Sequence, residues 1–221
     1  MEIGKVMKKS KFLFLIGVEG SGHHAVHSLL KDYYTEPHVS FQQSPWHNSL
    51  IKSWKALDNF MKQSHVFNWR KEWHHDQYLR HLNAALTEVH YASRKNSKTI
   101  FIETCSFPFD NPRSVTRSPD LYSFYETFKS DYDIRFIKID RDLKNAIKST
   151  MNRNFTNLES LQSRILTWNS SYISHFYKNV DAPKISFDLE KIHSDPHTFI
   201  SDLELFIDDK ININLSDFRV S

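Results

Sequence analysis

The 221-residue sequence lacks the features that mark several special classes of protein. Its single cysteine, Cys105, excludes an intramolecular disulfide and is typical of a reducing compartment. No apolar run approaches the roughly 18 residues that a membrane helix requires. A basic stretch (Lys8, Lys9 and Lys11) precedes an apolar run at 12–18, but that run is short for a signal-peptide core and no small-residue cleavage site follows it. We therefore expect a cytoplasmic protein without membrane insertion, whose domain begins almost at its first residue.

An excess of charge of one sign is also missing. The formal net charge is +3, from 29 basic and 26 acidic residues. This mild balance suits a small polyanionic ligand but falls short of the basic surface that nucleic acid requires. We expect no nucleic-acid partner, and the composition does not indicate an oligomeric state.

Four short apolar runs, rich in β-branched and aromatic residues, predict β-strands. Each run is nearly continuous rather than alternating, as expected of parallel strands that are covered by helices on both faces. The predicted strands are Phe12–Gly17, Thr99–Glu103, Ile134–Ile139 and Lys184–Phe187.

Between these runs, apolar residues recur every three or four positions, which predicts amphipathic helices. One such set lies at 79–89 and another at 158–176, and we interpret the aromatic residues of the second set as core. Asp195-Pro196 predicts the start of a last helix, with the carboxylate as its N-cap and the proline in its first turn. Strands that alternate with helices predict an α/β fold of three layers, in which helices flank a central, mainly parallel sheet.

No internal repeat or linker divides the chain, so we expect one domain over residues 1–221. Residues 31–97 match no motif, and we interpret them as a helical region on the acceptor side of the site. The tryptophans of this region are either core residues or a surface that stacks on a sugar ring or a phenol; they are Trp46, Trp54, Trp69 and Trp73.

Glycine is scarce, with four residues in the chain, yet three of them lie within Gly17–Gly22, directly after the first predicted strand. An apolar helical pattern follows. In such a loop, successive backbone amides converge on an anion at a helix N-terminus, where the helix dipole favours negative charge. The alternative is a tight turn that binds no ligand. The predicted phosphate-binding residues of the loop are Glu19, Gly20, Ser21, Gly22, His23 and His24.

The loop differs from the triphosphate-binding motif GxxxxGK[ST]. Gly17 and Gly22 fit that motif, but His23 and His24 stand where a lysine and a metal-binding hydroxyl belong. The sequence therefore favours a P-loop-like fold without the chemistry of an ATPase.

A second anion-binding feature follows the third predicted strand. Arg141 stands at the end of that strand, and Ser149 lies eight residues later on the predicted helix. The planar fork of a guanidinium and a nearby hydroxyl suit a phosphate group. The alternative for Arg141 is a surface ion pair with Asp140 or Asp142.

Taken together, these motifs resemble the family of sulfotransferases that depend on 3′-phosphoadenosine 5′-phosphosulfate (PAPS). The stretches 184–190 and 195–206 are similar to a late strand and a closing helix of that family. The resemblance implies a P-loop-like fold with PAPS as co-substrate, its 5′-phosphosulfate at the glycine-rich loop and its 3′-phosphate at Arg141 and Ser149. It also implies catalysis without a metal, and an acceptor hydroxyl or amine on a small molecule or carbohydrate.

The chain departs from the family pattern within the loop. Gly20 stands where most members carry a lysine or arginine that neutralises the leaving phosphate, and His23-His24 replaces the usual Thr-Thr. We hypothesise that His23 or His24 supplies the missing cation, because a neighbouring phosphate favours the imidazolium. As general base we favour Glu103, at the end of the second predicted strand, where ligands of open parallel sheets gather. A histidine is the alternative base.

Two other functions stay open at the level of sequence. One is a non-catalytic nucleotide-binding module on the same fold, with which Gly20 is compatible. The other is a divergent P-loop kinase, against which the missing lysine and hydroxyl count. The 13 histidines raise the question of a metal, but pairs such as His23 and His27 have no suitably spaced third ligand, so we predict no metal site.

Overall fold

The computed structural model describes residues 10–36, 38–40, 99–103, 121–152 and 159–214, and the statements below concern these residues. Their central element is a five-stranded sheet with the order β2-β3-β1-β4-β5, in which every pair of neighbours is parallel. The strands are β1 (Ser10–Ile16), β2 (His38–Ser40), β3 (Thr99–Glu103), β4 (Tyr132–Asp140) and β5 (Lys184–Asp188).

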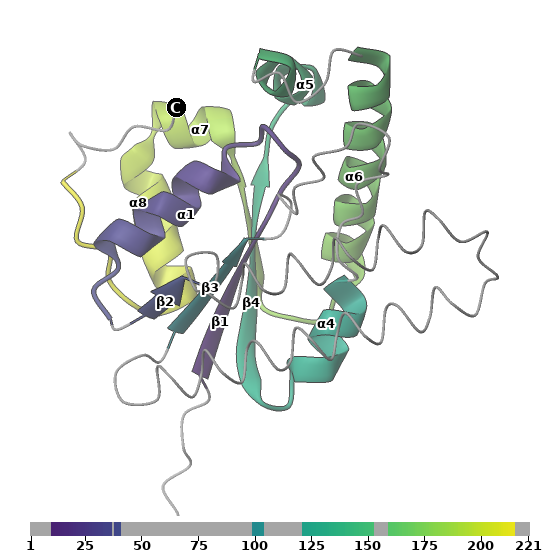
Figure 1. The fold of residues 1–221 in the computed structure, drawn as a ribbon. Helices are drawn as coiled ribbons and strands as arrows, with labels where there is room; N and C mark the ends of the chain where they lie inside the picture. Colours follow the sequence, from purple (N-terminus) through teal and green to yellow (C-terminus); the bar gives the residue numbers. More distant parts are fainter. Residues whose placement is uncertain (1–9, 37, 41–98, 104–120, 153–158, 215–221) are drawn as a thin grey trace, which may run out of the picture.

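Helices cover both faces of this sheet. Figure 1 shows α1, α7 and α8 on one face and α4, α5 and α6 on the other. Their bounds are α1 (His23–Tyr33), α4 (Leu121–Phe128), α5 (Leu143–Asn152), α6 (Glu159–Asn179), α7 (Leu189–Ser194) and α8 (Pro196–Ile207). The three-layer α/β fold with a parallel sheet, predicted from the sequence, is therefore confirmed.

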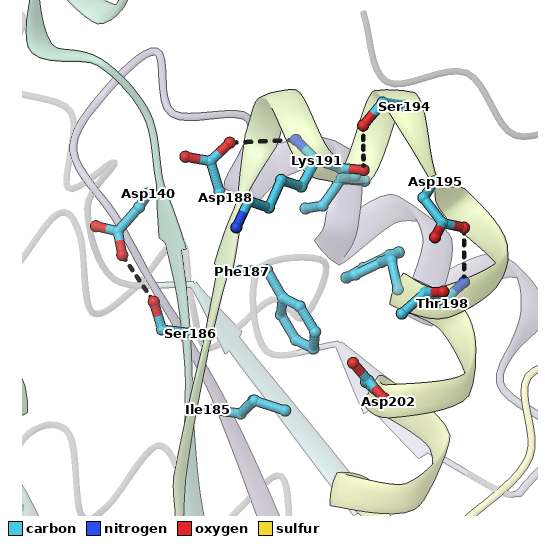
Figure 2. A pocket seen from close by; sticks show the side chains of 12 residues that line it. Asp140, Ile185, Ser186, Phe187, Asp188, Lys191, Ser194, Asp195, Thr198 and Asp202 are labelled. Atoms are coloured by element: carbon cyan, nitrogen blue, oxygen red, sulfur yellow. Dashed lines mark hydrogen bonds between the residues drawn. The ribbon is translucent and has the colours of Figure 1, made fainter.

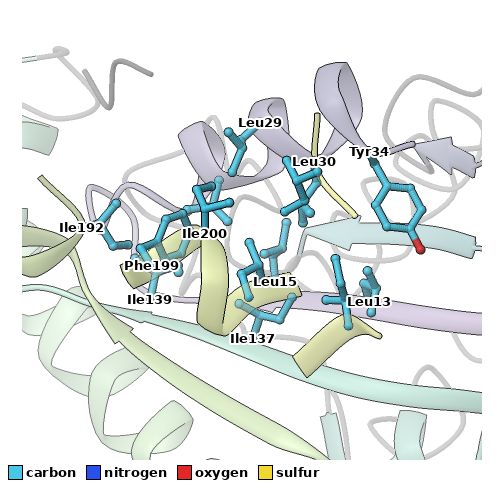
Figure 3. Close-up of a cluster of buried hydrophobic side chains, with 14 of the residues drawn as sticks. Leu13, Leu15, Leu29, Leu30, Tyr34, Ile137, Ile139, Ile192, Phe199 and Ile200 are labelled. Atoms are coloured by element: carbon cyan, nitrogen blue, oxygen red, sulfur yellow. The ribbon is translucent and has the colours of Figure 1, made fainter. Parts of the chain in front are cut away.

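Two separate cores explain why the first strand is apolar at nearly every position. Alternate residues of β1 enter opposite cores, and all of its residues from Lys11 to Ile16 are buried. On one face, Phe12 and Phe14 pack with Phe136 of β4 and Phe176 of α6. On the other face, Leu13 and Leu15 lie beneath α1 and α8 in a mainly aliphatic cluster (Figure 3). The sheet is thus held from both sides.

The predicted helix at 158–176 corresponds to α6. Phe176 is fully buried and its ring centroid lies 4.9 Å from that of Phe136, so the interpretation of this aromatic residue as core is confirmed. The N-cap of α8 also follows the sequence, because the carboxylate of Asp195 accepts a hydrogen bond from the backbone of Thr198 at 3.1 Å. The predicted helix at 79–89 lies outside the described residues.

Lys11, the last lysine of the basic stretch near the start of the sequence, is buried. It belongs to β1 and is 4% exposed. Its ammonium donates to the carboxylate of Asp209 and to the carbonyl of Ile207, and the hydroxyl of Tyr34 donates to the same carboxylate. This Lys11 cluster (Lys11, Tyr34 and Asp209) joins the start of β1 to the chain beyond α8.

The order of the strands defines where ligands gather. From β1 the chain runs through α1 to β2 on one side, whereas from β4 it runs through α5 and α6 to β5 on the other. The carboxyl ends of β1 and β4 therefore lie at a topological switch point, where the departing chains diverge over opposite faces. The glycine-rich loop and Arg141 follow these two strands directly.

Candidate functional site

The segment between β1 and α1 has the backbone geometry of an anion-binding loop. Gly20 and Gly22 both have left-handed backbones, with φ angles of 84° and 86°. Gly22 is the N-cap of α1, and no side chain caps this helix. In the first turn, the amide of Ala25 donates to the carbonyl of Gly22 at 3.0 Å, and the helix dipole adds a favourable field for an anion at this N-terminus.

Gly20 is confined by the backbone of α5. A Cβ atom at this position would lie 2.6 Å from the carbonyl oxygen of Ala146, far inside van der Waals contact. The main chain of α5 therefore occupies the space that a longer side chain at position 20 would need. Any side chain at position 20, a lysine included, therefore requires α5 to move.

Beneath the loop, Ser21 and His23 are both fully buried. The hydroxyl oxygen of Ser21 lies 3.1 Å from Nδ1 of His23, and the amide of Ser21 donates to the carbonyl of Val18 at 3.0 Å. These contacts support the loop from within. Glu19 is partly buried, and the side chains of His24 and Glu103 lie outside the described set.

Arg141 connects the two anion-binding features that the sequence indicated. It follows β4 directly, and its Nη1 donates to the carbonyl oxygen of Gly20 at 2.8 Å. Its Nε lies 3.7 Å from Oε1 of Glu190 in the first turn of α7, and this buried nitrogen has no hydrogen-bond partner. Arg141 thus bridges the loop and α7.

The alternative of an ion pair between Arg141 and its acidic neighbours does not match these contacts. Asp140 forms an ion pair with Lys138 at 2.8 Å and accepts a hydrogen bond from the hydroxyl of Ser186 at 2.7 Å. Asp142 accepts from the backbone amide of Asn145 at 3.0 Å, at the start of α5. Both carboxylates therefore have roles in local structure.

Ser149 and Glu103 lie at the same edge of the sheet as the loop. Ser149 is half-buried on α5, three residues after Ala146, and so shares the helix face that contacts Gly20. Glu103 ends β3 and is paired in register with Leu15 of β1. The fold thus brings the loop, Arg141 and the helix that carries Ser149 to the switch point, and the end of β3 lies on the other side of β1 from β4.

Glu190 is the charged neighbour of Arg141 that sequence reasoning missed. A signal was present, because Glu190 follows β5 and the carboxyl ends of parallel strands share one edge of the sheet. Which strand end faces Arg141, however, depends on the order of strands and not on the order of the sequence.

A cavity of about 540 Å³ lies elsewhere, between β5 and the helices α7 and α8. Figure 2 shows its apolar side at Ile185 and Phe187, with Asp202 at its margin. Neither the glycine-rich loop nor Arg141 lines it. This cavity is therefore not part of the candidate site.

The described ranges also bear on metal binding and on membrane insertion. Within them, no group of three or more histidine, cysteine, aspartate or glutamate side chains is arranged to hold a metal ion. Within them also, every helix is too short or too polar to cross a membrane.

Comparisons with known proteins bear on the fold. No family profile matches the sequence, and no curated protein sequence is significantly similar to it. Among solved structures, the chain is similar to the sulfotransferase domain of an olefin synthase from Synechococcus, with a TM-score of 0.55 and 13% identity over 94% of this chain and 76% of that one.

Two kinases have lower scores. A sugar kinase from Janibacter has a TM-score of 0.49 and 14% identity over 90% of this chain and 95% of its own. The deoxyadenosine kinase of M. mycoides, solved with bound dATP, has a TM-score of 0.41 and 16% identity, over 87% and 99%. At 13% identity, the likeness to the sulfotransferase domain concerns the fold alone.

Proposed function

We propose that this chain is a PAPS-dependent sulfotransferase, which moves the sulfuryl group of PAPS to a hydroxyl or amine of a small-molecule or carbohydrate acceptor. One observation carries the proposal. The hydrogen bond from Arg141 to the carbonyl of Gly20 joins two anion-binding elements that are 121 residues apart in the chain. A ligand with phosphate groups at both ends of one nucleoside fits two adjacent anion sites.

The two sites suit the two ends of that nucleotide differently. The N-terminus of α1 offers backbone amides and a positive dipole, which suit the 5′-phosphosulfate. Arg141 offers a guanidinium with a buried, unbonded Nε, and Ser149 on α5 adds a hydroxyl, which suits the 3′-phosphate.

A nucleoside triphosphate is a poorer fit for the same loop. The positions that would carry the phosphate-binding lysine and the metal-binding hydroxyl are occupied by His23 and His24. Gly20 provides no cation either, because it has no side chain, and the carbonyl of Ala146 occupies the space that a side chain would need. The loop therefore supports a ligand that binds without magnesium.

The reaction needs positioning, a base and charge stabilisation. The acceptor oxygen or nitrogen forms a bond to sulfur while the bond from sulfur to the bridging phosphate oxygen breaks, and 3′-phosphoadenosine 5′-phosphate (PAP) leaves. Glu103 takes the acceptor proton, with a histidine as the alternative base. The amides of α1, with His23 or His24, stabilise the charge on the departing phosphate.

The remaining features of the proposal concern the whole chain. Residues 1–221 form one sulfotransferase-like domain that acts in the cytoplasm, and residues 31–97 supply the acceptor side. Cys105 and the four tryptophans of that region lie outside the described residues.

Thermal unfolding with PAP, and separately with ATP and magnesium, tests the proposal. A ligand present at about 100 times its dissociation constant stabilises the folded state by roughly 2.7 kcal/mol. We expect PAP to stabilise the chain without magnesium. Stabilisation by ATP that requires magnesium, with none by PAP, would instead identify a kinase.

Transfer of labelled sulfate from PAPS across a panel of hydroxyl and amine acceptors then tests catalysis. Turnover of one acceptor class is the expected result. PAP binding without any turnover would favour the non-catalytic nucleotide-binding module, which the absence of a cation at Gly20 supports as the second candidate.

A further inference from the structure

The ion pair between Arg141 and Glu190 places a carboxylate beside the proposed phosphate site. The two charged groups are 3.7 Å apart at Nε and Oε1, and the two side chains are 25% and 54% exposed. The distance exceeds that of a hydrogen bond, and Nε of Arg141 is buried without a hydrogen-bond partner. Arg141 is therefore neutralised only loosely.

The backbone of Glu190 is held firmly at this position. The carboxylate of Asp188 accepts from the amides of Glu190 and Lys191 at 2.9 and 3.1 Å, which fixes the first turn of α7. The neighbouring Leu189 packs on the loop, since a Cβ at Gly22 would lie 2.5 Å from one of its methyl groups. Only the exposed side chain of Glu190 is thus able to move without disturbing the loop.

A carboxylate and a phosphate compete for one guanidinium. Both accept hydrogen bonds and neither donates them when ionised, and two anions at this distance repel each other. An exposed ion pair is weak, whereas a bidentate bond between arginine and phosphate is short and strong. The exchange of Glu190 for a phosphate on Arg141 is therefore favourable, but the ion pair lowers the net gain.

We propose that Glu190 is a competing counter-ion that sets the affinity for the 3′-phosphate. In the ligand-free protein it neutralises Arg141, and the 3′-phosphate displaces it. A nucleotide with a 3′-hydroxyl leaves the ion pair intact and gains nothing from Arg141. The competition also favours release of PAP, the product that keeps the 3′-phosphate. This inference rests on the proposed function.

Calorimetric titrations with PAP and with AMP, which lacks the 3′-phosphate, test the inference. The variants are Glu190→Gln and a matched control, Glu126→Gln, which removes the same charge from an exposed position on α4. We expect E190Q to bind PAP about five-fold more tightly than E126Q does, since the competing pair is gone, and to bind AMP equally well. An unchanged or reduced affinity of E190Q for PAP overturns the inference.

The design separates this inference from the proposed function. If the wild-type protein prefers PAP to AMP but E190Q has the same preference, only the role of Glu190 is wrong. If the wild-type protein binds no PAP, both proposals are wrong. Thermal unfolding of E190Q without ligand serves as the control for folding, and we expect the same transition as for the wild type.

Discussion

Two basic side chains lie at opposite ends of the central strands, and they differ in how many of their hydrogen-bond donors have a partner. Lys11, at the start of β1, is 4% exposed and donates to one carboxylate and one carbonyl. Arg141, beyond the end of β4, donates one hydrogen bond to Gly20, and its buried Nε has none. We call the Lys11 cluster closed because its buried ammonium is paired with a carboxylate and a carbonyl, whereas Arg141 has a donor without a hydrogen-bond partner.

We interpret this difference as that between a structural charge at Lys11 and the proposed binding charge at Arg141. Removing one partner of a closed, buried pair leaves an uncompensated charge, so the cost falls on folding. We expect a partly exposed guanidinium with a loose counter-ion to contribute little to folding, because water screens it. If Arg141 holds the ligand as proposed, its loss falls on binding. Four predictions test the comparison, from the largest expected effect to the smallest.

The largest effect is expected at the closed end. Asp209→Ala removes the acceptor shared by Lys11 and Tyr34, and we expect a loss of about 3–5 kcal/mol in the free energy of unfolding. Urea titration followed by circular dichroism measures it. The control is the double variant Lys11→Met/Asp209→Leu, which removes both charges. It should recover more than half of the stability that D209A loses. A loss below about 1 kcal/mol in D209A would show that the cluster is not closed.

The second effect concerns the loop that Arg141 contacts. Gly20→Ala and Gly22→Ala impose the same backbone strain, because the two φ angles are 84° and 86°. The neighbours of the added methyl group differ: it would meet a backbone carbonyl of α5 at Gly20, and a side-chain methyl group of the buried Leu189 at Gly22. We expect G20A to lose about 2–4 kcal/mol of stability and G22A about 1–2 kcal/mol less, both measured by urea unfolding. Equal losses would mean that α5 does not confine the loop.

The third effect is expected in binding and not in folding. Arg141→Ala removes charge-assisted hydrogen bonds worth about 1.5–3 kcal/mol, so the affinity for PAP should fall roughly 10- to 100-fold in calorimetric titration. The free energy of unfolding should change by less than about 1 kcal/mol. Arg141→Lys keeps the charge but not the planar fork, and should be intermediate. A large loss of stability in R141A would make Arg141 structural, like Lys11.

The smallest effect is a pH dependence near the closed end. Partial burial raises the pKa of Glu204, but hydrogen bonds from the amide of Ile211 and from Lys210 outweigh it and leave the pKa below its ordinary value. Because the folded-state pKa is depressed, this stabilisation is complete above the unfolded-state pKa and is lost as the pH falls through the folded-state pKa.

Glu204→Gln removes that titration. As the pH falls from about 5 to about 3, E204Q should lose less stability than the wild type does. The difference between the two losses should be under about 1 kcal/mol, measured by thermal unfolding across this range. Glu126→Gln, on α4, is the charge-matched control. Parallel curves for E204Q and the wild type would show that Glu204 does not stabilise the segment after α8.

The sequence predicted most of the sheet because buried parallel strands are apolar on both faces. The run at 99–103 coincides with β3, and the predicted first, third and last strands differ from β1, β4 and β5 only at their ends. It did not predict β2 (His38–Ser40), since three residues are too few to set a pattern. It also missed α7, where six residues cover less than two helical turns.

Local pattern and tertiary structure thus decided different parts of this protein. Local pattern fixed the apolar strands, the Asp195 cap and the glycine-rich loop, because each depends on neighbours within a few residues. Tertiary structure alone decided that Lys11 is buried, that Ala146 confines Gly20, and that Arg141 faces the loop and Glu190. Those contacts join residues far apart in the chain, and only the order of the strands determines which of them meet.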